Sequence, residues 1–241
     1  MVPDVRRFEQ LGELSRQASE ACVEVIRDAI SARGRGNKAC AIALAGGETP
    51  RQLYRWLATD DRDRIDWSRV HVFWGDERFV PADDARSNFR MARETLLDHV
   101  PCPSAQIHPM PTNIADADEA ATAYEHTLRQ FVGPGIPEID LLLLGLGSDG
   151  HTASLFPHSP ALRESTRLVV PVATTADPPV RLTLTVPILT AARRIFVIAA
   201  GPDKLAALEH VLAPDADPDR YPAAALRAAG PRLTWWVARM G

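Results

Sequence analysis

Ile139-Asp140-Leu141-Leu142-Leu143-Leu144-Gly145-Leu146 is the stretch that decides the fold, because it carries the strongest strand signal in the chain. A run this apolar is typical of a strand buried on both faces, as in parallel sheets that are covered by helices. Other short apolar runs predict further strands at residues 39–45, 70–74, 168–172, 182–186, 195–199 and 233–237.

Segments with a helical spacing of apolar residues fill most of the intervals between these strands. Helices are predicted for the first 30 or so residues and at 51–58, 87–99, 116–132, 202–212 and 222–229. Thr49 is placed to cap the helix at 51–58, with Pro50 at its first position. Strands that alternate with helices predict an α/β protein with a mostly parallel sheet flanked by helices. Residues 1–241 contain no repeat or low-complexity linker, so one domain is expected.

The composition excludes several classes of protein. The 241 residues carry a net charge of -4 without a long run of one sign, so nucleic acid is not expected as a partner. No apolar stretch approaches the ~18 residues of a membrane span, and no secretory signal is visible. Cys22, Cys40 and Cys102 lie far apart and the histidines lack ligand spacing, so no disulfide or metal site is predicted. A cytoplasmic protein is expected.

Gly46-Gly47-Glu48-Thr49 follows the strand at 39–45. In open parallel sheets, ligands bind at the carboxyl ends of the strands. Glycines let the backbone approach a ligand, and the next helix offers free N–H groups and the positive end of its dipole. The loop is therefore a candidate phosphate site, although a tight turn alone explains its glycines equally well.

Asp76-Glu77-Arg78 follows the strand at 70–74. Three adjacent charges at the end of an apolar strand are costly unless they are paired or used. In the functional interpretation Arg78 binds an anion and Asp76 lies near a titrating group. The structural alternative is an ion pair that caps a helix.

The loop after the strand at 139–146 presents Asp149 and His151 between glycines. It contains a formal G-x-G-x-x-G, but no acidic residue ends a second strand ~20 residues later and Pro157 cuts the expected helix short. A dinucleotide site is therefore rejected. A histidine beside an aspartate at the end of a strand favours general acid-base catalysis.

Two further cations, Arg181 and Lys204, are candidates for binding an anion. No G-x-S-x-G elbow is present, so covalent catalysis by a serine is not indicated. The residues together predict a base that activates water beside a phosphate pocket.

With these residues the chain resembles the 6-phosphogluconolactonases. The similar segments are residues 45–50, 73–81 with Ser87-Asn88, 144–157, 181–183 and 201–204. Gly-Asp-Glu-Arg and Asp-Gly-His-Thr-Ala-Ser-Leu-Phe-Pro are specific when they occur together. The resemblance implies a Rossmann-like fold, no metal or organic cofactor, and the opening of a 6-phosphogluconolactone in the oxidative pentose phosphate pathway. The expected partner is this small phosphosugar lactone, and the expected assembly is a monomer or a small homo-oligomer.

The sequence departs from the family at two places. Glu48 stands beside the expected phosphate, where a carboxylate should point away and leave binding to the backbone. Trp235-Trp236-Val237-Ala238 lacks the aspartate of the family's C-terminal pattern.

The expected mechanism is attack of water on the lactone carbonyl, with His151 as base and Asp149 or Asp76 orienting its ring. Gly46–Thr49 would hold the phosphate with Arg78, Arg181 or Lys204, and a cation or N–H would stabilise the oxyanion. A glucosamine-6-phosphate deaminase is the first alternative, but Ser154-Leu155-Phe156-Pro157 offers no carboxylate after the histidine. A non-enzymatic sugar-phosphate sensor is the second.

Overall fold

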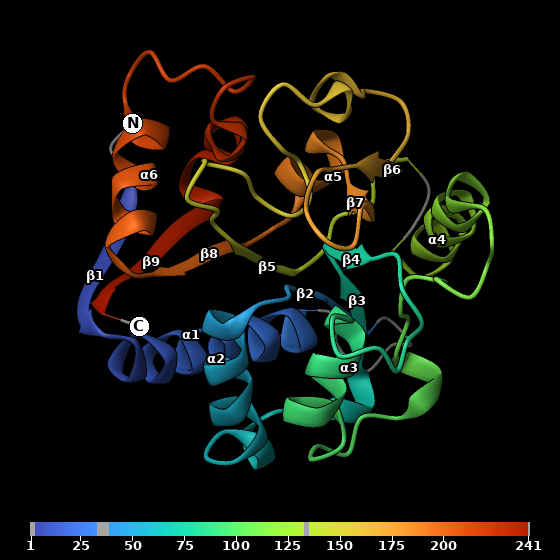
Figure 1. Cartoon of the computed structure of the whole chain (residues 1–241). Helices are drawn as coiled ribbons and strands as arrows, with labels where there is room; N and C mark the ends of the chain where they lie inside the picture. Colours follow the sequence, from blue (N-terminus) through green and yellow to red (C-terminus); the bar gives the residue numbers. More distant parts are fainter. Residues whose placement is uncertain (1–2, 33–38, 133–134, 241) are drawn as a thin grey trace.

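The computed structural model describes residues 3–32, 39–132 and 135–240. Its centre is a six-stranded sheet in which every neighbouring pair of strands is parallel (Figure 1). The strand order is β1-β9-β8-β5-β2-β3. The bounds are β1 Asp4–Gln10, β2 Cys40–Leu44, β3 Val70–Trp74, β5 Leu141–Gly145, β8 Ile195–Ala200 and β9 Leu233–Met240. The predicted α/β fold with a mostly parallel sheet is confirmed.

Helices cover both faces of this sheet. In the view of Figure 1, α1, α2 and α3 lie below the sheet, α5 and α6 lie above it, and α4 lies to the right. The bounds are α1 Leu11–Ala32, α2 Glu48–Ala58, α3 Asn88–Ala92, α4 Ala117–Val132, α5 Val186–Ala191 and α6 Pro202–Leu212. A π-helical turn, Arg93–Leu97, continues α3. The 3-10 helices are Arg62–Arg64, Trp67–Arg69, Ser104–Gln106, Pro160–Arg163 and the longer Pro222–Arg232, here η6.

A second, smaller sheet is antiparallel and has the order β4-β7-β6. Its strands are β4 Asp76–Arg78, β6 Val169–Ala173 and β7 Val180–Leu184. Only Gly75 separates β3 from β4, so the two sheets meet where β3 ends. The Gly75 N–H donates to Leu44 O at 2.9 Å, and the Leu184 N–H donates to Gly75 O at 2.9 Å. The junction places charged residues of β4 beside the carboxyl ends of the parallel strands.

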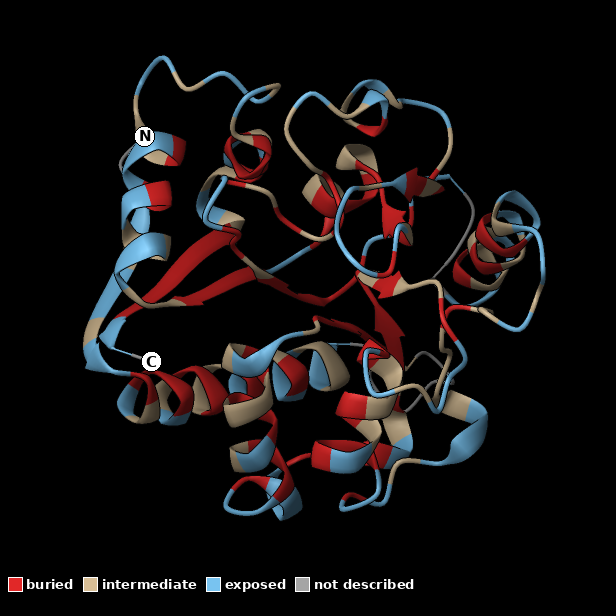
Figure 2. Ribbon diagram, in the orientation of Figure 1, coloured by how far each residue is buried: buried red, intermediate tan, exposed pale blue. Residues whose placement is uncertain are grey.

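The core explains why the middle of the sheet is so apolar. Residues 141–144 of β5 are each at most 1% exposed, since helices lie over both faces of the strand. Figure 2 shows the strands of the main sheet largely buried apart from edge strand β1, whereas the helices mix buried and exposed residues. Burial of this apolar surface is the main force that holds the layers together.

The loops after β2 and β5 diverge. From β2 the chain continues to β3 on one side of the sheet, and from β5 it continues to β8 on the other. A reversal of this kind opens a crevice at the carboxyl ends of the two strands, where α/β proteins bind ligands.

Several predicted elements were wrong. The first residues form edge strand β1 before α1 begins at Leu11, because a half-exposed strand lacks the apolar run of a buried one. Residues 76–78, for which no strand was predicted, form β4, and the predicted helix at 222–229 is part of a 3-10 helix. Helix α2 begins at Glu48 after Gly47, and no side chain caps it, so the predicted Thr49 cap is absent.

Candidate active site

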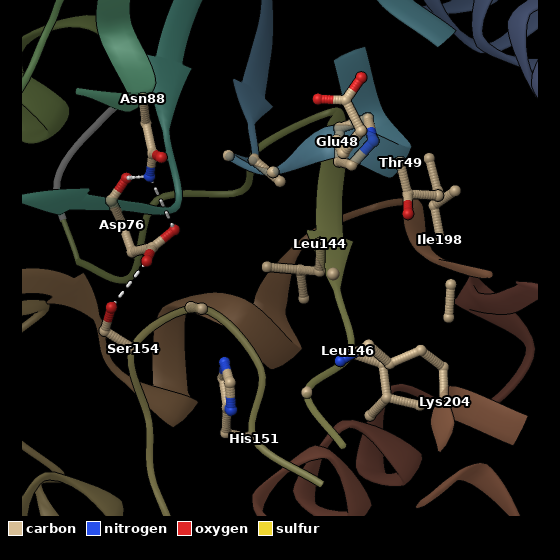
Figure 3. Close-up of a pocket in the computed structure, with 18 of the residues that line it drawn as sticks. Glu48, Thr49, Asp76, Asn88, Leu144, Leu146, His151, Ser154, Ile198 and Lys204 are labelled. Carbon is tan, nitrogen blue, oxygen red and sulfur yellow. Dashed lines mark hydrogen bonds between the residues drawn. The ribbon is translucent and has the colours of Figure 1, made fainter. Parts of the chain in front are cut away.

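A pocket of about 460 Å³ lies at the carboxyl ends of β2, β5 and β8 (Figure 3). Its lining contains all the predicted site residues except Asp149: Gly46, Gly47, Glu48, Thr49, Asp76, Arg78, His151, Arg181 and Lys204. These residues come from five segments that are distant in sequence, including the first turns of α2 and α6. The fold therefore brings the predicted site together in one cavity.

His151 and Asp149 form a pair at the end of β5. The His151 Nδ1 lies 2.6 Å from Asp149 Oδ1, and the His151 N–H donates to the same oxygen at 3.1 Å. A Cβ at Gly147 would overlap both side chains, so the glycine makes room for the pair. The hydrogen bond from His151 lowers the pKa of Asp149 to about 2. An ionised Asp149 keeps the proton on Nδ1 and leaves Nε2 as the acceptor on the imidazole.

Phe156 supports the imidazole from a second direction. Its ring centroid lies 4.7 Å from that of His151, and both residues line the pocket. Ala153, between them, has a φ of 48°, a left-handed conformation that is strained for a residue with a Cβ. The loop between His151 and Phe156 therefore holds a strained backbone conformation at Ala153.

Asp76 belongs to a different network. Its Oδ2 accepts from Ser154 Oγ at 2.6 Å, and Asn88 Nδ2 donates to its backbone oxygen at 2.9 Å (Figure 3). No hydrogen bond joins Asp76 to His151 among the described residues. Of the two candidates left open by the sequence, only Asp149 is hydrogen-bonded to the His151 imidazole in the described part of the chain.

Arg78 and Arg181 lie directly opposite each other on β4 and β7. Like charges in such positions destabilise a sheet unless something compensates them. Arg181 is 8% exposed, and its Nε has no hydrogen-bond partner in the described part of the chain. Burial, with the charge of Arg78, lowers the pKa of Arg181. Two cross-strand arginines, one with a buried donor that has no partner among the described residues, have the chemistry to bind an anion.

A second positive region lies across the pocket. Gly47, with φ 103°, precedes α2, and because no side chain caps this helix its first N–H groups stay available. Lys204 lies in the first turn of α6, and in Figure 3 it lies on the side of Thr49, opposite Asp76 and Ser154. The Glu48 side chain is 76% exposed and pairs with Arg51 at 3.0 Å. The Glu48 carboxylate is therefore neutralised by Arg51 and solvated.

Glu77 has a structural role, which corresponds to the capping alternative for the Asp-Glu-Arg motif. Its carboxylate accepts from the N–H groups of Arg78, Asn88 and Phe89, each at 2.7 Å, and from Ser87 Oγ at 3.1 Å. Burial raises the pKa of Glu77 to about 7, against the lowering effect of these N–H donors. Glu77 thus fixes the start of α3 and with it the position of Asn88.

Comparison with known proteins identifies the family. Residues 9–235 match the family model described as glucosamine-6-phosphate isomerases/6-phosphogluconolactonase. The chain belongs to this family. It is 48% identical to a 6-phosphogluconolactonase of Synechocystis over 87% of this chain and 85% of that protein. It is 41% identical to a 6-phosphogluconolactonase of Mycobacterium tuberculosis over 98% of this chain and 96% of that protein.

A solved structure of the same family supports the fold. The 6-phosphogluconolactonase of Trypanosoma brucei superposes with a TM-score of 0.87 at 32% identity, covering 98% of this chain and 96% of that one. The predicted Rossmann-like fold and the family resemblance are confirmed. Among the described residues no helix is long and apolar enough to cross a membrane, and no group of three or more His, Cys, Asp or Glu is placed to bind a metal.

Three polar or aromatic residues of the pocket lining were not among the predicted site residues: Asn88, Ser154 and Phe156. All three lie within the family's motifs, which was the available signal. Asn88 is 1% exposed, its Oδ1 has no hydrogen-bond partner in the described ranges, and a Cβ at Gly46 would overlap that oxygen. The glycine at 46 is therefore needed to accommodate the Asn88 side chain.

Proposed function

We propose that the protein hydrolyses 6-phospho-D-glucono-1,5-lactone to 6-phospho-D-gluconate, with His151 as the general base. The observation that carries the proposal is the His151–Asp149 pair, at 2.6 Å, beside a pocket that also holds Arg78, Arg181 and Lys204. The lactonase prediction is confirmed over the deaminase alternative by relatives at 41–48% identity over 87–98% of the chain.

The reaction uses the tautomer that Asp149 fixes. His151 Nε2 takes a proton from water as the water oxygen bonds to the lactone carbonyl carbon. The tetrahedral intermediate then breaks its bond to the ring oxygen, which recovers the proton from His151 as a hydroxyl. Asp149 stabilises the imidazolium that exists between these steps, as the acid of a catalytic triad does.

We assign the two positive regions to the two ends of the substrate. The phosphate binds the free N–H groups at the start of α2, with Lys204 as its counterion, because a helix N-terminus suits a dianion. The Arg78–Arg181 pair then faces the lactone and stabilises the developing oxyanion. Asp76, held by Ser154 and Asn88, is suited to accept hydrogen bonds from the sugar hydroxyls.

The function is tested by measuring lactone opening against spontaneous hydrolysis, with 6-phosphogluconolactone generated in place. We expect a large acceleration by the wild-type protein. Absence of any acceleration would reject the lactonase function. Ammonia release from glucosamine 6-phosphate would then support the deaminase, and tight phosphosugar binding that survives His151→Ala would support the sensor.

The phosphate assignment is tested by comparing phosphorylated and free gluconolactone. Lys204→Met should raise KM for the phosphorylated lactone and leave the free lactone unaffected, so the preference for phosphate shrinks. Arg181→Met should instead lower kcat for both substrates. The reverse result would exchange the roles of the two regions. Arg239→Met, exposed on β9 and outside the pocket lining, is the matched control.

We further propose that residues 1–241 act as one catalytic unit, that the protein works in the cytoplasm, and that it is a monomer or a small homo-oligomer.

A further inference from the structure

The segment after α6 packs against the loop that carries His151, although some 70 residues separate them in sequence. The Ala223 N–H donates to Gly150 O at 2.9 Å. Gly150 has φ 82°, and a Cβ added to it would lie 3.0 Å from the Tyr221 ring and 3.3 Å from Tyr221 Cα. Tyr221 therefore occupies the space directly over the residue that precedes His151.

Tyr221 also contacts helix α6. Its ring stacks on His210, with centroids 5.1 Å apart and planes 6° apart, and the Arg220 guanidinium lies 5.3 Å from the ring centroid. His210 lies near the end of α6, and Lys204 lies near its start. One side chain thus touches both the loop of the base and the helix of the cation that we assign to the phosphate.

Asp219 adds a second connection to the same loop. Its two carboxylate oxygens lie 2.9 Å from His158 Nδ1 and from Arg163 Nη1, and its backbone oxygen accepts from the His158 N–H at 2.8 Å. His158 has φ 61°, a left-handed conformation that needs support from its surroundings in a non-glycine residue. Residues 219–223, here called the clamp, therefore contact the loop on either side of His151, at Gly150 and at His158.

We infer that Tyr221 is a positioning residue, which sets where His151 stands relative to Lys204 by holding Gly150 against α6. The inference rests on the proposed role of His151 as the base. A glycine-rich loop has little rigidity of its own, and a displacement of ~1 Å of a catalytic group can cost ~100-fold in rate. Removing the ring leaves the phosphate site on α2 and α6 intact but frees the base to move.

The test compares Tyr221→Ala with Tyr221→Phe, which keeps the stacking ring. We expect Tyr221→Ala to lower kcat ~10–100-fold while KM changes less than about threefold, and Tyr221→Phe to stay near the wild type. Arg227→Ala, exposed on η6 and bonded to Ala213 O rather than to the His151 loop, is the matched control. Each rate is taken per folded molecule, from the melting curve of the same sample.

An unchanged kcat in folded Tyr221→Ala overturns the inference, and so does a loss confined to KM. Should Tyr221→Ala fail to fold, Asp219→Asn decides, since it keeps the volume and removes the charge. A loss of ~3–10-fold in kcat supports the clamp, and wild-type kcat rejects it.

Two different measurements test the role of Tyr221 and the proposed function. The wild-type rate over spontaneous hydrolysis tests the function, whereas the variant-to-wild-type ratio tests the clamp. The Cε1–H resonance of His151, assigned by its loss in His151→Gln, gives a readout without turnover. It should shift in Tyr221→Ala and stay in place in Tyr221→Phe, and an unmoved signal in both contradicts the clamp.

Discussion

Two histidine pairs in this molecule differ in what surrounds them. His151 pairs with Asp149 in the pocket at 2.6 Å, whereas His71 on β3 pairs with His108 at 2.8 Å, close to Phe73 and Phe131. The first partner is an anion, and the second is another neutral ring. Burial lowers the pKa of His71, and burial together with His71 lowers the pKa of His108 to about 4.

The difference shows that a hydrogen-bonded histidine is not by itself a catalytic one. In the proposed mechanism, the anionic partner allows His151 to accept a proton, because the carboxylate stabilises the imidazolium that forms. The His71–His108 pair gains most when both rings are neutral, so it packs the edge of the sheet. The charge of the hydrogen-bond partner and access to the pocket therefore distinguish the proposed catalytic role of His151 from the packing role of His71 and His108.

The largest expected effect comes from replacing the anionic partner. Asp149→Asn should lower kcat by ~10²–10⁴, because the amide no longer selects the tautomer or stabilises the imidazolium. Asp63→Asn, on an exposed 3-10 turn, is the matched control. The rate of lactone opening measures kcat. A wild-type kcat in Asp149→Asn would show that the charge of the partner does not matter for the role of His151.

Glu77 is a buried acid whose partners are backbone N–H groups and a serine hydroxyl, unlike Asp149, which pairs with a histidine. Glu77→Ala should destabilise the protein by roughly 2–4 kcal/mol, because it leaves buried donors at the start of α3 without an acceptor. Urea denaturation measures the change, with Glu94→Ala on the exposed side of the same region as control. A loss below about 1 kcal/mol would show that water replaces the carboxylate.

The neutral histidine pair should make the fold sensitive to acid. The folded-state pKa of His108 is about 4, below the usual histidine value of 6.5, so the stabilisation is fully present above about pH 6.5 and is lost as pH falls through about 4. The urea concentration at the midpoint of unfolding should fall between pH 7 and pH 4 in the wild type. In His108→Phe this fall should be smaller. His126→Ala, an exposed histidine on α4, should leave the fall unchanged. Equal slopes in wild type and His108→Phe would contradict this account.

The smallest expected effect is at Glu48. Because its side chain is 76% exposed and pairs with Arg51, Glu48→Gln should change kcat/KM by less than about threefold. The measurement is lactone opening at low and at high salt, since salt screens an exposed charge. A gain above tenfold at low salt would mean that the carboxylate repels the substrate phosphate.

Much of the fold was predictable from the sequence because buried strands leave a strong local signal. The run at 139–146 located β5, and the runs at 39–45 and 70–74 located β2 and β3. Strand β1 was missed, because its residues alternate without an apolar run and it pairs with β9 from the far end of the chain.

The site was predictable only in part. Loops after confident strands identified His151, Asp149 and Arg78, since their position follows from the fold class. Asn88 and Ser154 lie 12 and 78 residues from Asp76, and only the three-dimensional structure brings all three together. The antiparallel pairing of β4 with β7, which sets Arg78 against Arg181, has no local signal either.

The most direct test of the account is the rate of 6-phosphogluconolactone opening by His151→Ala beside the wild type, with His126→Ala as control. We predict a loss of ~10² or more in kcat for His151→Ala, with KM and the melting curve close to the wild type. An active wild type with an undiminished His151→Ala variant would contradict the central claim and move the base to another residue, with Asp76 the first to examine.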